Sequence, residues 1–152
     1  MDATESIVRL VAVMTESPQD PDPADLVSVL AANTAFYEAF ERRDFDALSD
    51  AWEHSDRIRC THPGWPTLAG WGAVSGSWTA LLTNNQRLQF ILTNERAAVA
   101  GDTAWVTLDE NILDSSDSAT VAALNVFVRS SLAPSGWQIV VHHGSVVHAS
   151  LR

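Results

Sequence analysis

Residues 60–78 read CTHPGWPTLAGWGAVSGSW, and we expect the rest of the chain to be organised around them. The preceding run Arg57–Thr61 predicts a short strand that ends at His62, because the next two residues, Pro and Gly, favour a turn. From Gly70 onward the segment predicts a helix, since its large apolar residues repeat at helical spacing: Trp71, Val74, Trp78 and Leu81. A titratable side chain followed by an indole-lined helix predicts one wall of a pocket for an apolar ligand with a polar group.

The composition is typical of one folded domain. The chain has 152 residues, 46% of them hydrophobic and 18% charged. Its formal net charge of −10 disfavours nucleic acid and anionic membranes as partners, since both are bound through Lys and Arg. No apolar run approaches the ~20 residues that span a bilayer, and Asp2 and Glu5 stand where a signal peptide is basic. We therefore expect a cytoplasmic protein with neither a nucleic-acid nor a membrane partner.

The first part of the chain differs from the rest. Residues 1–22 are expected to form an N-terminal extension and linker, with a short amphipathic helix at Thr4–Thr15 and an acidic, proline-containing tether at Ser17–Asp22. The domain is expected to occupy residues 23–152.

Three helices and four longer strands are expected within the domain. The first helix begins at Pro23 with Asp22 as its N-cap, and the second follows Asp44 and reaches Trp52. After the helix that starts near Gly70, the pattern becomes strand-rich, with turns between the strands Arg87–Val99, Thr103–Leu113, Thr120–Leu132 and Trp137–His148.

This order of elements indicates an α+β fold. We expect a cone-shaped barrel, in which a curved, mostly antiparallel sheet wraps on the three N-terminal helices. The concave face of such a sheet and the helices would enclose a cavity. The other face, if apolar, would pair two subunits in a homodimer.

Several motifs accompany these elements. They are Phe36-Tyr37 with Phe40, Asp44 to Leu48, His62 to Trp65, Gly70-Trp71 with Ser77-Trp78, Gly101 to Val106, Asn125 to Arg129, and Trp137 to Ser145. On these residues the chain resembles the SnoaL-like branch of the nuclear transport factor 2-like superfamily, from about Asp25 to Ser150. The resemblance implies the cone-shaped fold. It does not specify a reaction, because the same fold hosts isomerases, dehydratases, cyclases, epoxide hydrolases and many non-enzymes.

Ketosteroid-isomerase-like enzymes are the members most worth comparing. They carry a catalytic Asp before a Pro at the end of the first strand, where this chain has His62-Pro63 after a two-residue insertion. Their oxyanion donors are a Tyr on the first helix and a protonated acid on a later strand. Phe36 falls at the Tyr position, Tyr37 lies about 100° round the helix, and Asn125 is the polar residue nearest to the acid position. The comparison therefore implies a pocket-lining His62 rather than the isomerase reaction itself.

Two histidines are the candidate catalytic groups. His62 is a general acid or base, a hydrogen-bonding anchor for a ligand, or a turn histidine bonded to backbone. In the last strand His143 shares its side-chain parity with Trp137, so we expect His143 to face the cavity and His142 the outer face. A bulge between Trp137 and His143 would reverse the two.

One of two adjacent carboxylates is expected to face inward. If Trp105 is core, Asp109 follows it; if Val106 and Leu108 are core, Glu110 does. The resemblance favours Glu110. A buried carboxylate would have a perturbed pKa and could pair with a cavity histidine, whereas an exposed one would be solvated.

Two further side chains are expected to be structural. Arg129 shares a face with Asn125 and is expected to form an ion pair at the sheet rim rather than bind a ligand carboxylate. Cys60 is expected to be a small buried hydrophobe rather than a nucleophile. No spaced pair of the His-x-x-x-His type is present, so we expect neither a metal nor a cofactor.

The expected function is that of a small-molecule pocket protein. It would bind, or convert without a cofactor, a small apolar or carbonyl-containing ligand, as isomerases, cyclases and dehydratases do. The alternative is a non-catalytic dimerisation or interaction module whose cavity is filled by its own side chains. The residues expected to bind the ligand are Phe36, Tyr37, Trp52, Cys60, Trp71, Trp78, Phe90, Glu110 and Asn125.

Overall fold

The computed structural model describes residues 20–84, 87–114 and 118–148. The helix expected at Thr4–Thr15 lies outside these residues. Within them, no helix is both long and apolar enough to cross a membrane.

The described residues form three helices: α2 (Pro23–Glu41), α3 (Phe45–Asp50) and α4 (Trp71–Thr83). The two expected N-caps are confirmed, because the Asp22 carboxylate accepts from the Ala24 backbone N–H and the Asp44 carboxylate from that of Ala47. Helix α3 ends at Asp50, two residues earlier than expected, since Trp52 instead forms a bridge with Ile139 of the sheet.

In the part of the chain that the structure describes, six strands form one sheet. They are β1 (Arg59–Thr61), β2 (Leu68–Ala69), β3 (Gln89–Ala100), β4 (Thr103–Leu113), β5 (Ser118–Arg129) and β6 (Trp137–Val146), in the spatial order β2-β1-β6-β5-β4-β3. The antiparallel meander from β3 to β6 is confirmed. Strand β1 joins it by pairing parallel to β6, and the short β2 was not expected.

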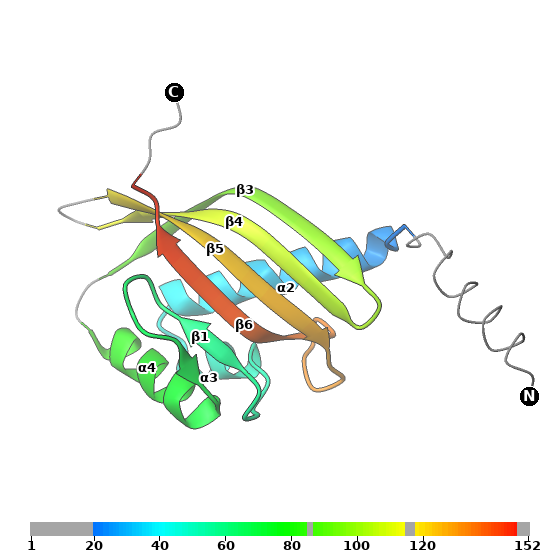
Figure 1. The fold of residues 1–152 in the computed structure, drawn as a ribbon, viewed down its shortest axis with the longest axis horizontal. Helices are drawn as coiled ribbons and strands as arrows, with labels where there is room; N and C mark the ends of the chain where they lie inside the picture. Colours follow the sequence, from blue (N-terminus) through cyan, green and yellow to red (C-terminus); the bar gives the residue numbers. More distant parts are fainter. Residues whose placement is uncertain (1–19, 85–86, 115–117, 149–152) are drawn as a thin grey trace, which may run out of the picture.

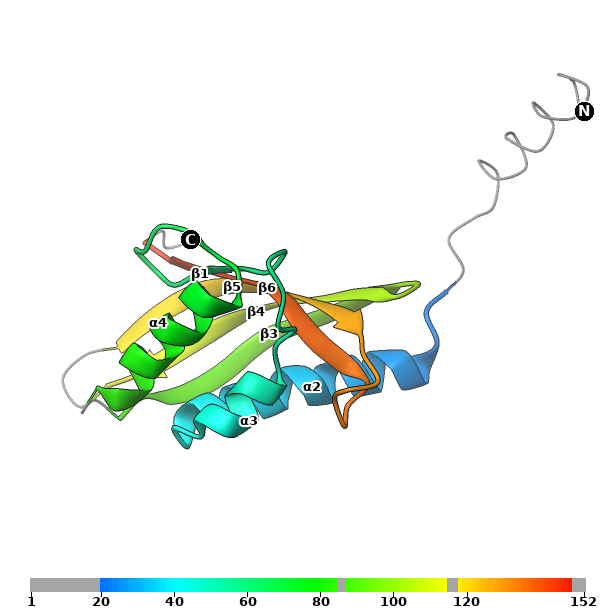
Figure 2. The same cartoon turned by 90° about the horizontal axis from the view of Figure 1, so that it is seen from below.

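The α+β architecture with a curved sheet is confirmed, and Figures 1 and 2 show α2 crossing one face of the sheet. The sheet is not closed into a barrel, however, because β2 and β3 remain as its two edges. We call the face that packs on α2 the inner face and the opposite one the outer face.

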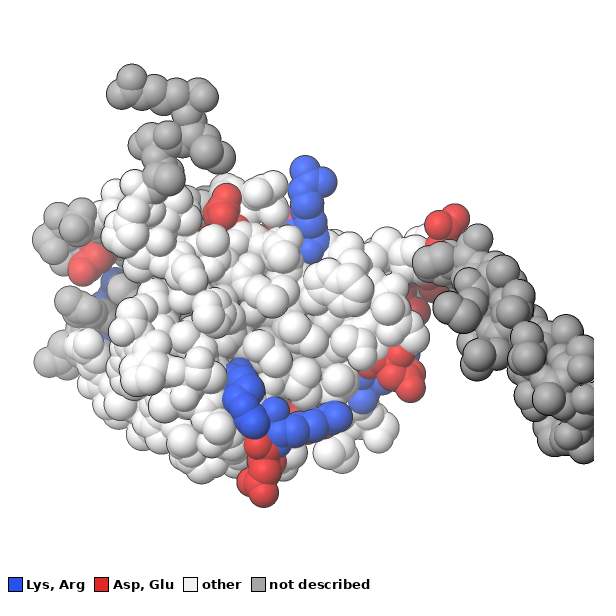
Figure 3. All heavy atoms as spheres, in the orientation of Figure 1, with Lys and Arg blue, Asp and Glu red and all other residues white. Residues whose placement is uncertain are grey.

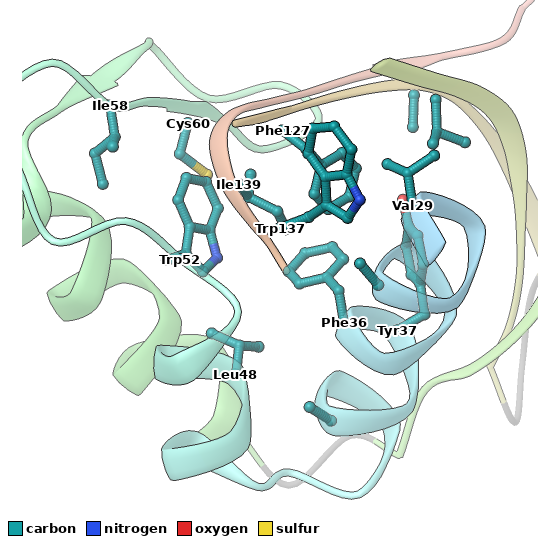
Figure 4. Packing of buried hydrophobic residues seen from close by; sticks show 14 of the residues in the cluster. Val29, Phe36, Tyr37, Leu48, Trp52, Ile58, Cys60, Phe127, Trp137 and Ile139 are labelled. Atoms are coloured by element: carbon teal, nitrogen blue, oxygen red, sulfur yellow. The ribbon is translucent and has the colours of Figure 1, made fainter. Parts of the chain in front are cut away.

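The core lies between α2 and the inner face (Figure 4). Its centre is the buried ring of Phe36, which packs edge-on against Trp78 at 5.5 Å and Trp52 at 6.4 Å between ring centroids. Trp137 and Phe127 extend the same cluster along the sheet. This packing fixes the helix against the strands and leaves space at one end of the inner face.

Two bulges interrupt the regular alternation of the sheet. In β3 the pairing with β4 shifts between Thr93 and Arg96, and Asn94 has a left-handed φ of 56°. In β6 the pairing with β5 shifts so that Val140 is the extra residue, because Val126 pairs with Val141 and Phe127 with Ile139. A bulge reverses which side chains face inward beyond it.

The outer face is largely uncharged. Figure 3 views this face, and the charged side chains lie mainly around its rim. Trp105 and Leu124 are 39% and 36% exposed on it. An exposed apolar sheet face of this kind is the usual setting for contact with another protein.

Candidate active site

A cavity of about 240 Å³ lies between α2, α4, the loop after β1 and the inner face. Its apolar wall includes Phe36, Phe40, Trp65, Trp78, Leu81 and Phe90. Four titratable side chains also line it: Tyr37, His62, Glu110 and His142. The cavity therefore combines a mostly aromatic wall with a small number of groups that can exchange protons.

Glu110 and Tyr37 form a short, buried hydrogen bond at the cavity. The Tyr37 hydroxyl donates to Glu110 Oε1 at 2.5 Å, and both residues are buried. Burial raises the pKa of Glu110 to about 7, although the hydrogen bond from Tyr37 opposes this change. Burial and the neighbouring Glu110 raise the pKa of Tyr37 well above 10.0. Near neutral pH, Glu110 can therefore both take up and release a proton.

Asn125 joins this pair to a histidine. Its Nδ2 donates to the Tyr37 hydroxyl oxygen at 3.1 Å and to Asn33 Oδ1 at 2.8 Å, and its Oδ1 lies 2.5 Å from His142 Nδ1. Because this oxygen can only accept, His142 carries its proton on Nδ1 and its lone pair on Nε2. Burial lowers the pKa of His142 to about 3, so the ring is neutral.

His62 reaches the cavity from the loop that follows β1. The Ser77 hydroxyl donates to the backbone oxygen of Val74 at 2.7 Å, so its oxygen accepts the proton of His62 Nε2 at 2.9 Å. His62 Nδ1 is then the lone-pair nitrogen. Burial lowers the pKa of His62 to about 4, and its ring packs edge-on against Trp78 and Trp65.

The expectation that His143 faces the cavity is wrong. His143 is exposed, near Ser145 Oγ, and His142 is buried instead. The cause is the bulge at Val140, which inserts one residue between Trp137 and the histidines and so reverses their parity. Of the two carboxylates, Glu110 faces inward and Asp109 lies on the outer face.

Trp71 does not belong to the cavity wall, contrary to expectation. It stacks on the His54 ring at 4.1 Å and is half-buried. Trp71 shares a helical face with Trp78, but seven residues separate them, which is about 10 Å along the axis. The cavity lies at the Trp78 end of α4.

The other residues expected at the site fall into two groups. Phe36, Tyr37, Trp78, Phe90 and Glu110 line the cavity, whereas Trp52, Cys60 and Asn125 lie buried behind its wall. Cys60 Sγ lies 3.7 Å from His62 Nε2, and burial raises the pKa of the Cys60 thiol to about 12, so the thiol is unreactive. Arg129 forms the expected rim ion pair, with Asp25 at 2.7 Å.

Three polar residues of the site were missed. Asn33 interrupts the apolar stripe of α2, and a lone amide in such a stripe is a signal that could have found it. Ser77 precedes Trp78 on α4 and was named only as part of a motif shared with the family, without a role at the site. Glu95, which accepts from Asn33 Nδ2 at 3.2 Å, reaches its partner only through the β3 bulge, and a single sequence does not show that bulge.

The described residues contain no cluster of three His, Cys, Asp or Glu side chains that could hold a metal ion. The arrangement can instead move protons. One carboxyl group titrates near neutrality, and two neutral imidazoles each present a lone pair beside an apolar space.

Known proteins with similar chains share this fold. One is a protein from Streptomyces avermitilis, whose crystal structure is described as that of a candidate dehydratase of the NTF2-like family. Its sequence is 43% identical to this chain, and the two structures superpose with a TM-score of 0.74 over 82% of this chain and 97% of the other. A candidate association domain of a calcium/calmodulin-dependent protein kinase type II from Thiobacillus denitrificans is 29% identical, covers 87% of this chain and 100% of its own, and has a TM-score of 0.65.

A relative found by sequence is the F-box protein SKIP8 of Arabidopsis thaliana, which is 27% identical over 79% of this chain. The matched region spans 50% of the length of that relative. The family profile of the SnoaL-like domain matches residues 29–149. On this match and the fold, the chain belongs to the SnoaL-like domain family, within the NTF2-like group of folds.

Proposed function

We propose that this protein is a cofactor-independent acid–base enzyme acting on a small, largely apolar molecule that carries a carbonyl or hydroxyl group. The observation that carries the proposal is the Glu110–Tyr37 pair, buried in an apolar cavity beside two neutral histidines. A carboxyl group whose pKa is about 7 is matched to proton transfer at neutral pH.

The chemistry follows from which groups can accept a proton. Glu110 as a carboxylate would take a proton from the carbon next to a carbonyl, leaving the electron pair delocalised onto the carbonyl oxygen. Glu110 would then return that proton to another carbon, which is an isomerisation, or to a leaving hydroxyl that departs as water, which is a dehydration. His62 Nδ1 and His142 Nε2 would accept hydrogen bonds from a substrate hydroxyl.

The cavity limits the size of the substrate. An engineered apolar cavity of about 150 Å³ binds benzene, so a volume of about 240 Å³ suits a somewhat larger molecule. Trp78, which lines the cavity, has a buried indole N–H with no hydrogen-bond partner among the described residues.

The test is hydrogen exchange into small ketones and β-hydroxy ketones in deuterated water, followed by NMR. The protein should accelerate exchange at the carbon next to the carbonyl, and Glu110→Gln should slow it at least about 100-fold, the lower range for loss of a general base. Glu38→Gln is the matched control, because Glu38 lies on the exposed side of α2. Equal rates for Glu110→Gln and the parent protein would remove Glu110 from the reaction.

A second candidate role, in association, rests on the outer face. Its exposed Trp105 and Leu124 and its small number of charged side chains favour a homodimer formed through this face (Figure 3). The relative described as an association domain has the same fold. Sedimentation at micromolar concentration should give a dimer that Trp105→Glu converts to a monomer. A monomeric parent protein would contradict this interface.

A further inference from the structure

A chain of hydrogen bonds crosses the molecule from the exposed Glu95 to the buried His142. It runs through two amides, with 3.2 Å from Asn33 Nδ2 to Glu95, 2.8 Å from Asn125 Nδ2 to Asn33 Oδ1, and 2.5 Å from His142 Nδ1 to Asn125 Oδ1. Asn33, Asn125 and His142 are at most 4% exposed. We propose that Glu95 is a positioning residue, which fixes the orientation of both amides and so keeps the lone pair of His142 on Nε2.

The direction of the chain is fixed from its outer end. The Glu95 carboxylate can only accept, so Asn33 must turn its amide nitrogen outward and its oxygen inward. Asn125 must then present its nitrogen to Asn33 and its oxygen to His142. His142 is thereby left with a proton on Nδ1, and each step follows because an amide has donors at one end and an acceptor at the other.

A second anchor acts on Asn125, but its strength depends on Glu110. Tyr37 donates to Glu110 and therefore accepts from Asn125 Nδ2, which gives Asn125 the same orientation. If Glu110 takes up a proton, it can donate to Tyr37, and the tyrosine is then free to donate to Asn125 instead. Only the Glu95 end still opposes a flip of Asn125. This consequence rests on the proposed function, in which Glu110 is protonated during each turnover.

Bulges in β3 and β6 place both ends of the hydrogen-bonded chain on the inner face. Without the β3 bulge, Glu95 would share the parity of Thr93 and lie on the outer face. The bulge places Asn94 and Glu95 together opposite Leu108, a buried inner-face residue, and the left-handed backbone of Asn94 accompanies it. The β6 bulge places His142 inward in the same way. Two irregularities on separate strands therefore serve one hydrogen-bonded chain.

The titratable groups around the hydrogen-bonded chain come from several helices, strands and loops. Tyr37 faces it from α2, His62 from the loop after β1, Glu110 from β4, and His143 adjoins His142 on β6. Glu110 is the group expected to change charge between about pH 5.5 and pH 8.5 within the cavity, since burial sets its pKa to about 7. His142, with a pKa of about 3, stays neutral over this range.

The experiment is a ¹⁵N–¹H NMR measurement of the His142 imidazole, which distinguishes the two neutral tautomers. The full chain is measured without ligand at about pH 5.5 and about pH 8.5, on either side of the Glu110 titration. The parent protein should carry the proton on Nδ1 at both values. In Glu95→Lys the outer anchor becomes a donor, so at the lower pH at least about half of His142 should carry its proton on Nε2. At the higher pH, ionised Glu110 should preserve the parent tautomer.

Glu38→Lys is the matched control for charge reversal, and it should behave as the parent does at both pH values. Glu95→Gln is the milder variant if Glu95→Lys does not fold, and it should show a minor Nε2–H population at the lower pH only. The proposal is overturned if His142 keeps the parent tautomer in every Glu95 variant. It is also overturned if Glu38→Lys changes the tautomer of His142 as much as Glu95→Lys does. The readout needs no substrate, so a tautomer shift without catalysis in the parent would refute the enzyme proposal alone.

Discussion

The two faces of one sheet differ completely in chemistry although they are built from alternating residues of the same strands. The inner face places Glu110, Asn125 and His142 in a closed network beside a cavity. The outer face presents Trp105 and Leu124 to solvent, with His143 next to them. Adjacent histidines thus have opposite environments.

This contrast shows that position across the sheet, rather than residue type, decides the chemistry. Burial lowers the pKa of His142 to about 3 and raises that of Glu110 to about 7. The face on which a side chain lies is in turn decided by single bulges in β3 and β6. Substitutions matched across the two faces can therefore test the contrast directly.

The largest difference in stability between the two faces is expected when an apolar side chain is truncated. Phe36→Ala removes a ring packed among Tyr37, Trp52 and Trp78 and should lower the free energy of unfolding by about 3–5 kcal/mol. Leu124→Ala on the outer face should lower it by less than about 1 kcal/mol at the same protein concentration. Urea denaturation measures both, and equal losses would contradict the placement of the core.

Glu110 should make the free energy of unfolding depend on pH. Because burial raises its pKa from 4.5 to about 7, the folded protein retains a proton that the unfolded chain releases between these values. The stabilising contribution of Glu110 is therefore present below about pH 4.5 and is lost as the pH rises to about 7, by up to about 3 kcal/mol.

Glu110→Gln has no such titration, so its stability relative to the parent should increase from about pH 5 to about pH 8. Denaturation curves at several pH values measure the change, and the same series for Glu38→Gln controls for net charge. A difference between Glu110→Gln and the parent that does not vary with pH would mean that Glu110 is not desolvated.

The neighbouring histidines give the next comparison. His142→Ala leaves Asn125 Oδ1 without its donor and opens a small cavity, so the free energy of unfolding should fall by about 2–3 kcal/mol. His143→Ala should change it by less than about 0.5 kcal/mol, because that side chain is exposed. If His143→Ala proved the more damaging of the two, the register of β6 would be wrong.

The smallest effect concerns the bulge of β3. Asn94 has a left-handed φ of 56°, which asparagine and glycine tolerate better than other residues. Asn94→Ala should therefore cost about 1 kcal/mol, whereas Asn94→Gly should be nearly neutral. Thermal unfolding of the two variants makes the comparison, and the reverse order would argue against the bulge.

The sequence was sufficient for features that depend on local chemistry. Asp22 and Asp44 cap their helices as expected, and the bounds of β4, Thr103–Leu113, agree with those of the structure. The helical spacing of apolar residues also placed Phe36 and Trp78 in the interior. These signals are local, because each depends on a few neighbouring residues.

The features that decide the site could not be read in the same way. A bulge is a property of the pairing between two strands, so the exchange of His143 for His142 depends on the partner strand β5 as well as on β6. Glu95 and Asn33 are 62 residues apart and meet only after a bulge and a helix are packed together. Periodicity within one segment does not contain this information.

The central claim is that Glu110 is a proton-exchanging group on the inner face. The most direct test is a ¹³C NMR titration of side-chain carboxyl groups in the free protein, with the Glu110 signal assigned by its loss in Glu110→Gln. The structure predicts a pKa of about 7 for this carboxyl group. A value near the ordinary 4.5 would contradict the claim and leave the cavity without a group that titrates at neutral pH.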